Sequence, residues 1–313
     1  MSYSNLVIAG SIAKDTIFNF DGKLSDSLLS QNLSSLSVSF QTDNITKSLG
    51  GPLLNIAHSV CNFSIDNVKL IGAVGQDSQD ILEFLKSAGL DLSDIIIDKT
   101  LLTACGSCIT DIENNQIWGF CDGAGVLLVD FELAKICDKN SLLLLAPTNA
   151  KAIVSLTNQA IKLGLDYVYD VGMHIPVLSS QQLRLGVDGC KYLIVNEYEI
   201  EQIKSKIEFD EKAFVVSGKI LITTLGSKGV RYLDQDQEIF IPAYKANCID
   251  PVGAGDAWRG AFFGELINGR NLMVCLVTGN VVASIAVESK GGINYTLDRD
   301  EFDKRFDMIL NNI

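Results

Sequence analysis

The segment DPVGAGDAWRG, residues 250–260, holds the residues best suited to chemistry: Gly253, Ala254, Gly255 and Asp256, which open a predicted helix. Glycines at a helix start let main-chain N–H groups approach a ligand, and the helix dipole favours negative charge there. A carboxylate at this point would repel an anion unless it accepts a proton from a hydroxyl that attacks a phosphoryl group. An ordinary glycine-rich helix start is the alternative interpretation.

Two segments near the N-terminus carry residues that could bind such a hydroxyl compound. In GSIAKD, Ser11 and Asp15 follow the first predicted strand, and ligands of open α/β sheets bind beyond the carboxyl ends of strands. In SLGGPLLN, Gly50 and Gly51 precede a helix that begins near Pro52 and carries Asn55. A carboxylate and an amide can hold a vicinal diol by paired hydrogen bonds. Taken alone, each segment is equally typical of a turn or a helix start.

Two later strand ends carry further candidates. NEYE places Asn196 and Glu199 three residues apart at a strand-to-helix junction, on one face of the helix. TTLGSKG places Thr224, Gly226 and Gly229 at the end of the next strand. Alone, the first is also typical of an acidic helix start and the second of a hairpin turn into GVRYL.

The elements that position these residues alternate along the chain. Six apolar runs read as buried strands: 6–10, 68–75, 141–147, 167–172, 192–196 and 220–226. Amphipathic helices are predicted between some of them, over 78–89, 149–164 and 196–207. Helices between apolar strands imply a mostly parallel sheet covered on both faces. We therefore expect an α/β protein, a three-layer α/β/α sandwich, in a single domain over residues 1–313.

Residues 16–48 depart from this alternation, since they carry two alternating apolar segments and no strong helix. A small β lid inserted after the first strand fits this pattern, and an ordinary edge hairpin is the alternative. The segment also holds Phe18, Phe20 and Phe40. These rings could cover an aromatic ligand, or could simply pack the lid against the body or a second copy.

Composition narrows the class of protein. The net charge of −13 argues against binding to nucleic acid or to an anionic membrane surface. No run reaches the roughly 18 apolar residues of a membrane span, and the N-terminus lacks the basic region of a signal peptide, so a cytoplasmic protein is expected. Cys105 and Cys108 form a CxxC pair on a predicted strand, where they face opposite sides, so reduced thiols are expected rather than a metal or redox site.

Together these segments resemble the PfkB (ribokinase-like) family of carbohydrate and nucleoside kinases. The similarity runs nearly from end to end, through GSIAKD, GG…N, GAVGQD, NEYE, TLGSKG, GAGD and SKGGINY. It implies a ribokinase-like fold, ATP-dependent phosphorylation of a primary hydroxyl with Mg²⁺ and often K⁺, and a monomer or homodimer whose lid closes over the substrate.

By this resemblance Asp256 is the catalytic base, and Gly253 to Gly255 form the anion hole for the transferred phosphoryl group. Asn196 and Glu199 match the residues that organise Mg²⁺ and its waters near ATP. Three further residues match the loop along the nucleotide: Thr224, Gly226 and Gly229.

The acceptor and cation sites follow from the same resemblance. The acceptor's sugar hydroxyls fall to residues of the two N-terminal segments: Ser11, Asp15, Gly50, Gly51 and Asn55. Asp250 and residues 286–292 fall where family members bind a monovalent cation.

Within the family, the sequence is most similar to bacterial adenosine and nucleoside kinases, through GSIAKDTI, SVSF, ITDIENNQI, VNEYE and DPVGAGDAWRG. Leu54 and Pro251 depart from the usual small residue and threonine, and Asn115 and Gln116 stand where eukaryotic adenosine kinases carry an arginine. Three basic residues could replace its charge: Lys14, Lys47 and Arg259.

The resulting hypothesis is a kinase that phosphorylates the 5′-hydroxyl of a nucleoside, with adenosine as the first acceptor to expect. A sugar kinase acting on ribose, fructose or a relative is the alternative with the same chemistry. A non-catalytic nucleoside or sugar sensor is the alternative of another class, against which the intact Asp256 and Glu199 speak. A redox or metal protein using the CxxC pair ranks third.

Overall fold

The centre of the computed structural model, which describes residues 3–27, 38–42, 44–63, 67–113 and 115–313, is an eight-stranded sheet. Its order is β14-β13-β12-β11-β10-β9-β1-β4. The bounds are β1 Asn5–Ala9, β4 Val68–Ile71, β9 Ser141–Leu145, β10 Asp166–Tyr169, β11 Tyr192–Asn196, β12 Ile220–Thr224, β13 Gly229–Leu233 and β14 Glu238–Pro242. All neighbouring strands from β4 to β12 pair in parallel, whereas β13 and β14 are antiparallel.

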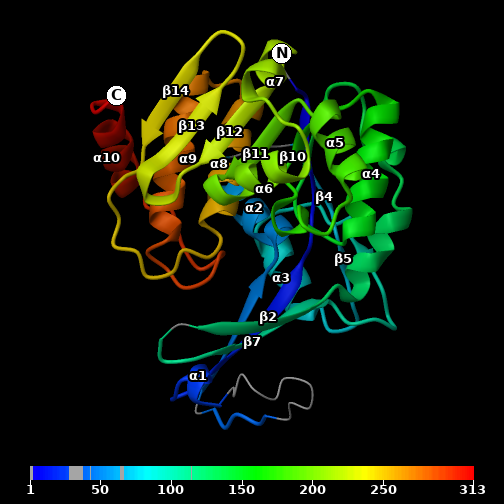
Figure 1. Cartoon of the computed structure of the whole chain (residues 1–313), viewed down its shortest axis with the longest axis vertical. Helices are drawn as coiled ribbons and strands as arrows, with labels where there is room; N and C mark the ends of the chain where they lie inside the picture. The colour runs from blue at the N-terminus through cyan, green and yellow to red at the C-terminus, as the bar shows by residue number, and fades with distance from the viewer. Residues whose placement is uncertain (1–2, 28–37, 43, 64–66, 114) are drawn as a thin grey trace.

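Helices cover both faces of this sheet (Figure 1). One face packs against α2 (Pro52–Val60), α3 (Gln79–Ser87), α8 (Ala254–Ile267), α9 (Leu272–Ala286) and α10 (Arg299–Leu310). The other packs against α4 (Ala150–Leu163), α5 (Ser180–Gly189), α6 (Glu197–Lys206) and α7 (Glu211–Val216). Alternate strand residues point to the two cores, as Ile8 and Val7 do, and burying one such side chain contributes about 1.5–3 kcal/mol. The predicted three-layer α/β/α sandwich is confirmed.

A second, four-stranded sheet projects from the body (Figure 1). We call it the lid sheet; its order is β3-β2-β7-β8, with β2 at Ala13–Asn19, β3 at Asn44–Gly50, β7 at Ala104–Thr110 and β8 at Gln116–Cys121. The expected lid segment, 16–48, supplies most of β2 and β3 and the short α1 (Leu24–Ser27), but its residues 28–37 and 43 lie outside the described part of the chain. Strands β7 and β8 enlarge the lid sheet beyond that segment.

The predicted single strand over 68–75 is wrong, because the chain leaves the central sheet at Gly72. Strand β4 ends at Ile71, and β5 (Ala73–Val74) pairs instead with β6 (Ile96–Ile97). A Cβ at residue 72 would lie 2.8 Å from Cδ1 of Ile12, so only glycine fits this bend without displacing a neighbour. The glycine inside the apolar run was the available signal, since an isolated glycine in a strand pattern marks a bulge or a close backbone approach.

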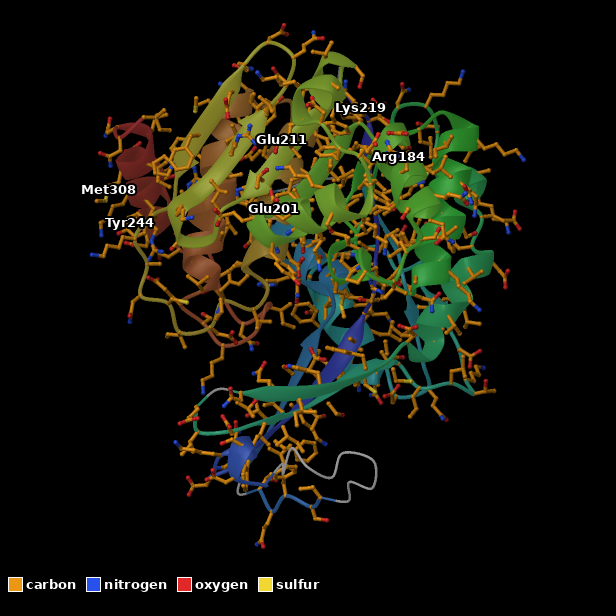
Figure 2. All side chains as sticks on the ribbon, in the orientation of Figure 1. Arg184, Glu201, Glu211, Lys219, Tyr244 and Met308 are labelled. Carbon is orange, nitrogen blue, oxygen red and sulfur yellow. The ribbon has the colours of Figure 1, made fainter. Side chains whose placement is uncertain are left out.

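Charged side chains project from the outer surfaces of the body (Figure 2). Glu201 and Glu211, labelled there, both pair with Lys204, at 2.9 and 3.0 Å. Exposed pairs of this kind contribute about 0–1 kcal/mol each, so the two cores hold the fold together. Among the helices that the structure describes, none is both long and apolar enough to cross a membrane.

Candidate active site

The start of α8 has the main-chain geometry of an anion site. Gly253 precedes the helix with φ 79°, a left-handed conformation that favours glycine, and no side chain caps the helix there. The N–H of Ala254 donates to the Pro251 carbonyl at 3.3 Å, and the N–H of Gly255 is available to a ligand. A Cβ at Gly253 would lie 2.6 Å from Cα of Gly292, so the two glycine-rich loops touch. The anion hole stays a prediction, and the groups offered for it are those of the backbone.

Asp256 lies in this first turn and is held by Asn55 from the neighbouring helix α2. The Asn55 Nδ2 donates to Oδ2 of Asp256 at 2.8 Å. Burial raises the pKa of the Asp256 carboxyl to about 6, against the opposing effects of Arg259 and of the Asn55 hydrogen bond. The Asn55 Oδ1 is buried and accepts no hydrogen bond from the described residues. Asn55 therefore orients the expected base; its predicted contact with sugar hydroxyls stays a prediction.

Behind Asp256 lies a buried ion pair between Arg259 of α8 and Asp170, the residue after β10. Burial, together with the nearby negative charge of Asp170, raises the pKa of Glu199, while Arg259 opposes this. The four charged groups therefore form one cluster at the carboxyl ends of the strands. Sequence reasoning missed Asp170, because it ends an apolar run and reads as part of the strand.

Asn196 and Glu199 form a capping box at the start of α6. The Asn196 Oδ1 accepts from the N–H groups of Tyr198 and Glu199, and the Glu199 Oε2 accepts from the N–H of Asn196 at 2.8 Å. This leaves the Glu199 Oε1 facing the cluster, 3.6 Å from where a Cβ of Gly172 would lie. The pair thus has a structural role whether or not it also organises Mg²⁺.

The segment predicted to contact the nucleotide is a hairpin between β12 and β13, as the alternative interpretation of its sequence expected. Thr224 ends β12 next to Asn196 of β11, with which it is in register. Gly226 and Gly229 both have positive φ, of 56° and 120°. The three residues thus lie at the same sheet edge as Asn196, and their contact with a nucleotide stays a prediction.

Asp15 extends from β2 of the lid sheet toward two glycines. A Cβ at Gly106 of β7 would lie 2.5 Å from Oδ1 of Asp15, and a Cβ at Gly50 of β3 would lie 2.9 Å from Oδ2. Burial raises the pKa of the Asp15 carboxyl, and the main-chain N–H of Gly106 opposes this. Because both flanking positions are glycine, the carboxylate occupies the space that their side chains would fill.

Two aromatic rings also lie against Gly106. The Gly106 Cβ position is 3.1 Å from both Cε1 of Phe120 and Cζ3 of Trp118, and these two rings are stacked with centroids 5.2 Å apart. Phe120 is 62% exposed, so its ring is open to a ligand. Sequence reasoning missed both residues; their alternation in QIWGFC was the available signal.

The predicted aromatic cover is wrong for Phe18. That residue is in register with Ile45 of β3 and Ile109 of β7, one position out of phase with Asp15, so it lies on the opposite face of the lid sheet. Phe20 and Phe40 pack edge-to-face against each other, with centroids 5.1 Å apart. This packing fits the alternative interpretation, in which they stabilise the lid.

Ser11 and Gly51 lie where β1 leads into β2 and where α2 begins. The carbonyl of Ser11 accepts from the N–H of Leu53 at 3.1 Å. Gly51 has φ 91°, and a Cβ there would lie 2.4 Å from the Ser11 carbonyl oxygen. Only glycine permits this close approach, which brings the start of α2, and with it Asn55, beside the lid.

The base of the lid sheet is tied to the body on the side away from Asp15. Lys14 pairs with Asp80 at 2.8 Å, and the Asp77 carboxylate accepts from the N–H and hydroxyl of Thr103, just before β7. Of the three basic candidates, Lys14 is thus engaged at the lid base and Lys47 is exposed on β3. Arg259 belongs to the cluster of four charged groups around Asp256.

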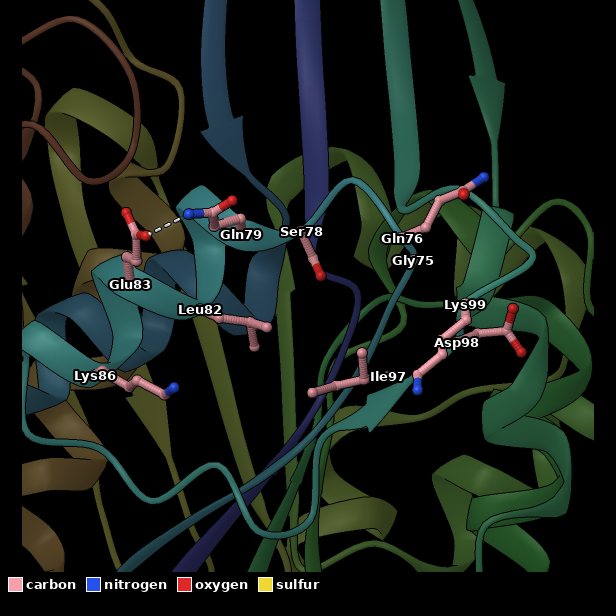
Figure 3. Close-up of a pocket in the computed structure, with 10 residues that line it drawn as sticks. All are labelled: Gly75, Gln76, Ser78, Gln79, Leu82, Glu83, Lys86, Ile97, Asp98 and Lys99. Carbon is pink, nitrogen blue, oxygen red and sulfur yellow. Dashed lines mark hydrogen bonds between the residues drawn. The ribbon is translucent and has the colours of Figure 1, made fainter.

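A pocket of about 390 Å³ lies next to this lid base, between the start of α3 and β6 (Figure 3). Its lining carries both signs of charge: Glu83, Lys86, Asp98 and Lys99. The residues predicted for the active site do not line it, and the mixture of charges favours neither an anion nor a cation. The pocket is therefore separate from the site.

Asp250 joins the loop before α8 to the loop that carries Gly291 and Gly292. Its Oδ1 accepts from the N–H of Val252 at 3.0 Å and its Oδ2 from the N–H of Gly291 at 2.9 Å. This places Asp250 beside the 286–292 region, as the resemblance implies. Binding of a monovalent cation there stays a prediction.

Cys105 and Cys108 lie on β7, as expected, with Cys108 buried and Cys105 partly buried. Both are free thiols, and burial raises the pKa of Cys105. Over the described ranges of the chain, no three His, Cys, Asp or Glu side chains gather closely enough to hold a metal ion. The CxxC pair therefore has the strand geometry that was predicted for it.

Comparison with known proteins agrees with this geometry. Residues 25–299 match the family model described as pfkB family carbohydrate kinase. A nucleoside kinase of Methanothermobacter thermautotrophicus is 29% identical over 261 residues, 82% of this chain and 84% of that protein. Two solved nucleoside kinases share the fold: that of Burkholderia thailandensis in complex with inosine (26% identity, 98% and 99% of the two chains, TM-score 0.86) and that of Methanocaldococcus jannaschii (25%, 98% and 100%, 0.85).

Proposed function

Because the chain belongs to the PfkB family of carbohydrate kinases, we propose that it transfers the γ-phosphoryl group of ATP to the 5′-hydroxyl of a nucleoside. Family membership makes it an ATP-dependent kinase with an alcohol acceptor, as the sequence predicts. The relatives and solved structures described above are nucleoside kinases, which supports the same acceptor class here. Adenosine is the first base to test.

The observation that favours a nucleoside over a free sugar is the arrangement of side chains around Gly106. It brings the Asp15 carboxylate within reach of the same space as the rings of Trp118 and Phe120. A carboxylate can accept hydrogen bonds from both hydroxyls of a ribose, and stacking of a base on an aromatic ring contributes about 1–3 kcal/mol. A free sugar would leave the exposed Phe120 ring without a partner.

Phosphoryl transfer needs a base and a site for developing negative charge. Asn55 holds Oδ2 of Asp256, which leaves Oδ1 to accept the proton of the acceptor hydroxyl. The hydroxyl oxygen then forms its bond to the γ-phosphorus while the bond from that phosphorus to the bridging oxygen breaks and ADP leaves. N–H groups and the dipole at the start of α8 stabilise the transferring group. A base whose pKa is about 6 is mostly ionised at neutral pH and still accepts a proton readily.

The donor set suits Mg²⁺ held mainly by nucleotide phosphates. Mg²⁺ is usually bound by one or two carboxylates together with waters and substrate phosphates, and Glu199 offers one free carboxylate oxygen in a cluster with excess negative charge. When bound, the ion neutralises charge on the phosphates of ATP. We also place a monovalent cation such as K⁺ near Asp250 and residues 286–292.

The test is turnover with Mg·ATP against adenosine, inosine, guanosine, cytidine, ribose and fructose, with and without K⁺. Turnover confined to nucleosides is the expected result. Turnover on ribose or fructose alone would replace the nucleoside by a sugar while leaving the role of Asp256 intact. Silence on every acceptor, with nucleoside binding seen by calorimetry, would instead support a sensor.

A further inference from the structure

The buried ion pair between Arg259 and Asp170 lies directly behind the anion site, and the reaction outlined above gives it no role. Asp170 is 2% exposed and Arg259 is 7% exposed. Arg259 follows Asp256 by three residues on α8, so both side chains lie on the same side of the helix. A charge so close to the expected base, and so well shielded from water, acts on it strongly.

Gly255 brings the guanidinium up against the first turn of the helix. A Cβ at this position would lie 2.6 Å from Nη1 of Arg259. The glycine therefore has a second role beside opening the main chain to a phosphoryl group, since a side chain there would displace the guanidinium. Asp170, at the end of β10, holds the other side of the same group.

The charges around Asp256 come from several elements. Arg259 on α8 favours its ionised form, whereas Asp170 after β10 disfavours it. Tyr295 faces it from the loop before α10, and burial keeps that phenol neutral by raising its pKa. Glu199 on α6 interacts with Asp170 and Arg259. Arg259 is thus the cation that balances three carboxylates.

We propose that Arg259 is a positioning residue for phosphoryl transfer: anchored by Asp170, it keeps Asp256 ionised and ready to accept the acceptor's proton. Arg259 acts through Asp256 and needs no contact with the substrate. Asp170 fixes the guanidinium in place and at the same time opposes its electrostatic effect. The inference rests on the proposed function, in which Asp256 is the base. The competing interpretation is a tie that only holds β10 against α8.

The test is the dependence of kcat on pH for Arg259→Gln, Asp170→Asn and the wild type. Without the guanidinium, Asp256 should hold its proton to higher pH. The acid limb of the pH profile, where kcat falls as the pH drops, should therefore move up by about 1–3 pH units in Arg259→Gln, with kcat recovering at alkaline pH. In Asp170→Asn the limb should move down, because the remaining cation is less compensated. A structural tie predicts a kcat lowered equally at every pH in both variants, and that result would overturn the proposal.

Two further variants guard against loss of folding. Arg259→Lys keeps the charge and should return the acid limb toward that of the wild type. Arg231→Gln is the matched control, since Arg231 pairs with Glu211 and Glu238, neither of which belongs to the charged cluster around Asp256, and its loss should lower the unfolding temperature without moving the limb. An acid limb that moves equally in the control would contradict the proposal.

A readout without turnover separates this inference from the proposed function. The Asp256 carboxyl carbon can be titrated by NMR in the ligand-free protein, in the wild type and the same variants. Opposite displacements of its midpoint in Arg259→Gln and Asp170→Asn support the pair even if no nucleoside is phosphorylated. An unchanged midpoint in both refutes it even if the wild type is an active nucleoside kinase.

Discussion

The charged cluster of the body and the lid sheet each carry an aspartate of the candidate site, in different surroundings. In the body, Asp256 is half-buried, lies among other charges and is held by Asn55. On the lid, Asp15 lies over two glycines, near an aromatic ring that is 62% exposed. Under the proposed function, Asp256 reacts with the acceptor and Asp15 binds it.

Under the proposed function, this difference assigns the reaction to the body and the choice of acceptor to the lid sheet. The body can serve any acceptor that presents a hydroxyl to Asp256, because helix start, base and charge cluster recognise only the reacting atoms. The rings of Trp118 and Phe120 lie on the lid sheet, and under the proposed function they contact the rest of the acceptor. Changes in the body are therefore expected to alter kcat, and changes in the lid to alter KM.

The largest effect is expected from Asp256→Asn in the body. Removing a general base lowers kcat by about 10²–10⁴-fold, whereas nucleoside and ATP binding, measured by calorimetry, should change little. The unfolding temperature at pH 8 is not expected to fall, because burial disfavours the charge that is removed. A variant with nearly normal kcat would remove the base from the body side of the comparison.

A smaller effect, and of the other kind, is expected from Phe120→Ala and Trp118→Ala in the lid. Loss of stacking should raise KM for a nucleoside by roughly 5–150-fold, equivalent to about 1–3 kcal/mol, with kcat little changed. Any activity on free ribose should be unaffected, since ribose has no base to stack.

Phe18→Ala is the matched control for the lid variants, because Phe18 lies in the same sheet on the face opposite Asp15. Its KM for nucleosides should match that of the wild type. Equal increases in KM for Phe18→Ala and Phe120→Ala would show that lid packing, and not a stacking face, governs acceptor binding.

The two carboxylates should also separate in their pH dependence. The pKa of Asp256 is raised to about 6, so kcat should fall as the pH drops through 6 and be about tenfold lower at pH 5 than at pH 8. Burial also raises the pKa of Asp15, so acidification should raise KM as this carboxylate loses its capacity to accept two hydrogen bonds. Steady-state kinetics from pH 4.5 to 9 measure both. A kcat that stays constant down to pH 5 would contradict the assignment of Asp256.

The comparison also explains which parts of the molecule the sequence predicts. Short buried strands alternating with helices predict the three-layer body. The local sequence pattern identifies each strand or helix, and the helical connections between strands imply parallel pairing. The lid sheet is different. Strand β7 was predicted as a strand, but its parallel pairing with β2 joins residues far apart in the chain and leaves no local pattern.

Register decides the rest of the candidate site. Phe18 was expected at the acceptor and Trp118 was not, yet one position of register places Phe18 behind the sheet and Trp118 in front. The sequence did not predict Asp170 either, because its partner Arg259 belongs to a helix far away in the chain. Glycine-rich turns are local and were predicted, whereas contacts between distant elements require the fold.

The smallest effect, and the one that separates structure from function most finely, is expected from Asn196→Ala. Loss of its capping box should lower the stability of the protein by about 1 kcal/mol, because two N–H groups at the start of α6 lose their acceptor. If Asn196 also contacts the nucleotide, KM for ATP should rise as well. Ser179→Ala provides the control, since Ser179 and Gln182 form an equivalent capping box at the start of α5. Chemical denaturation of the two variants should show equal losses of stability. Kinetics with ATP should show a higher KM only for Asn196→Ala. Identical kinetics would limit Asn196 to its helix cap and leave nucleotide binding to Thr224 and its hairpin.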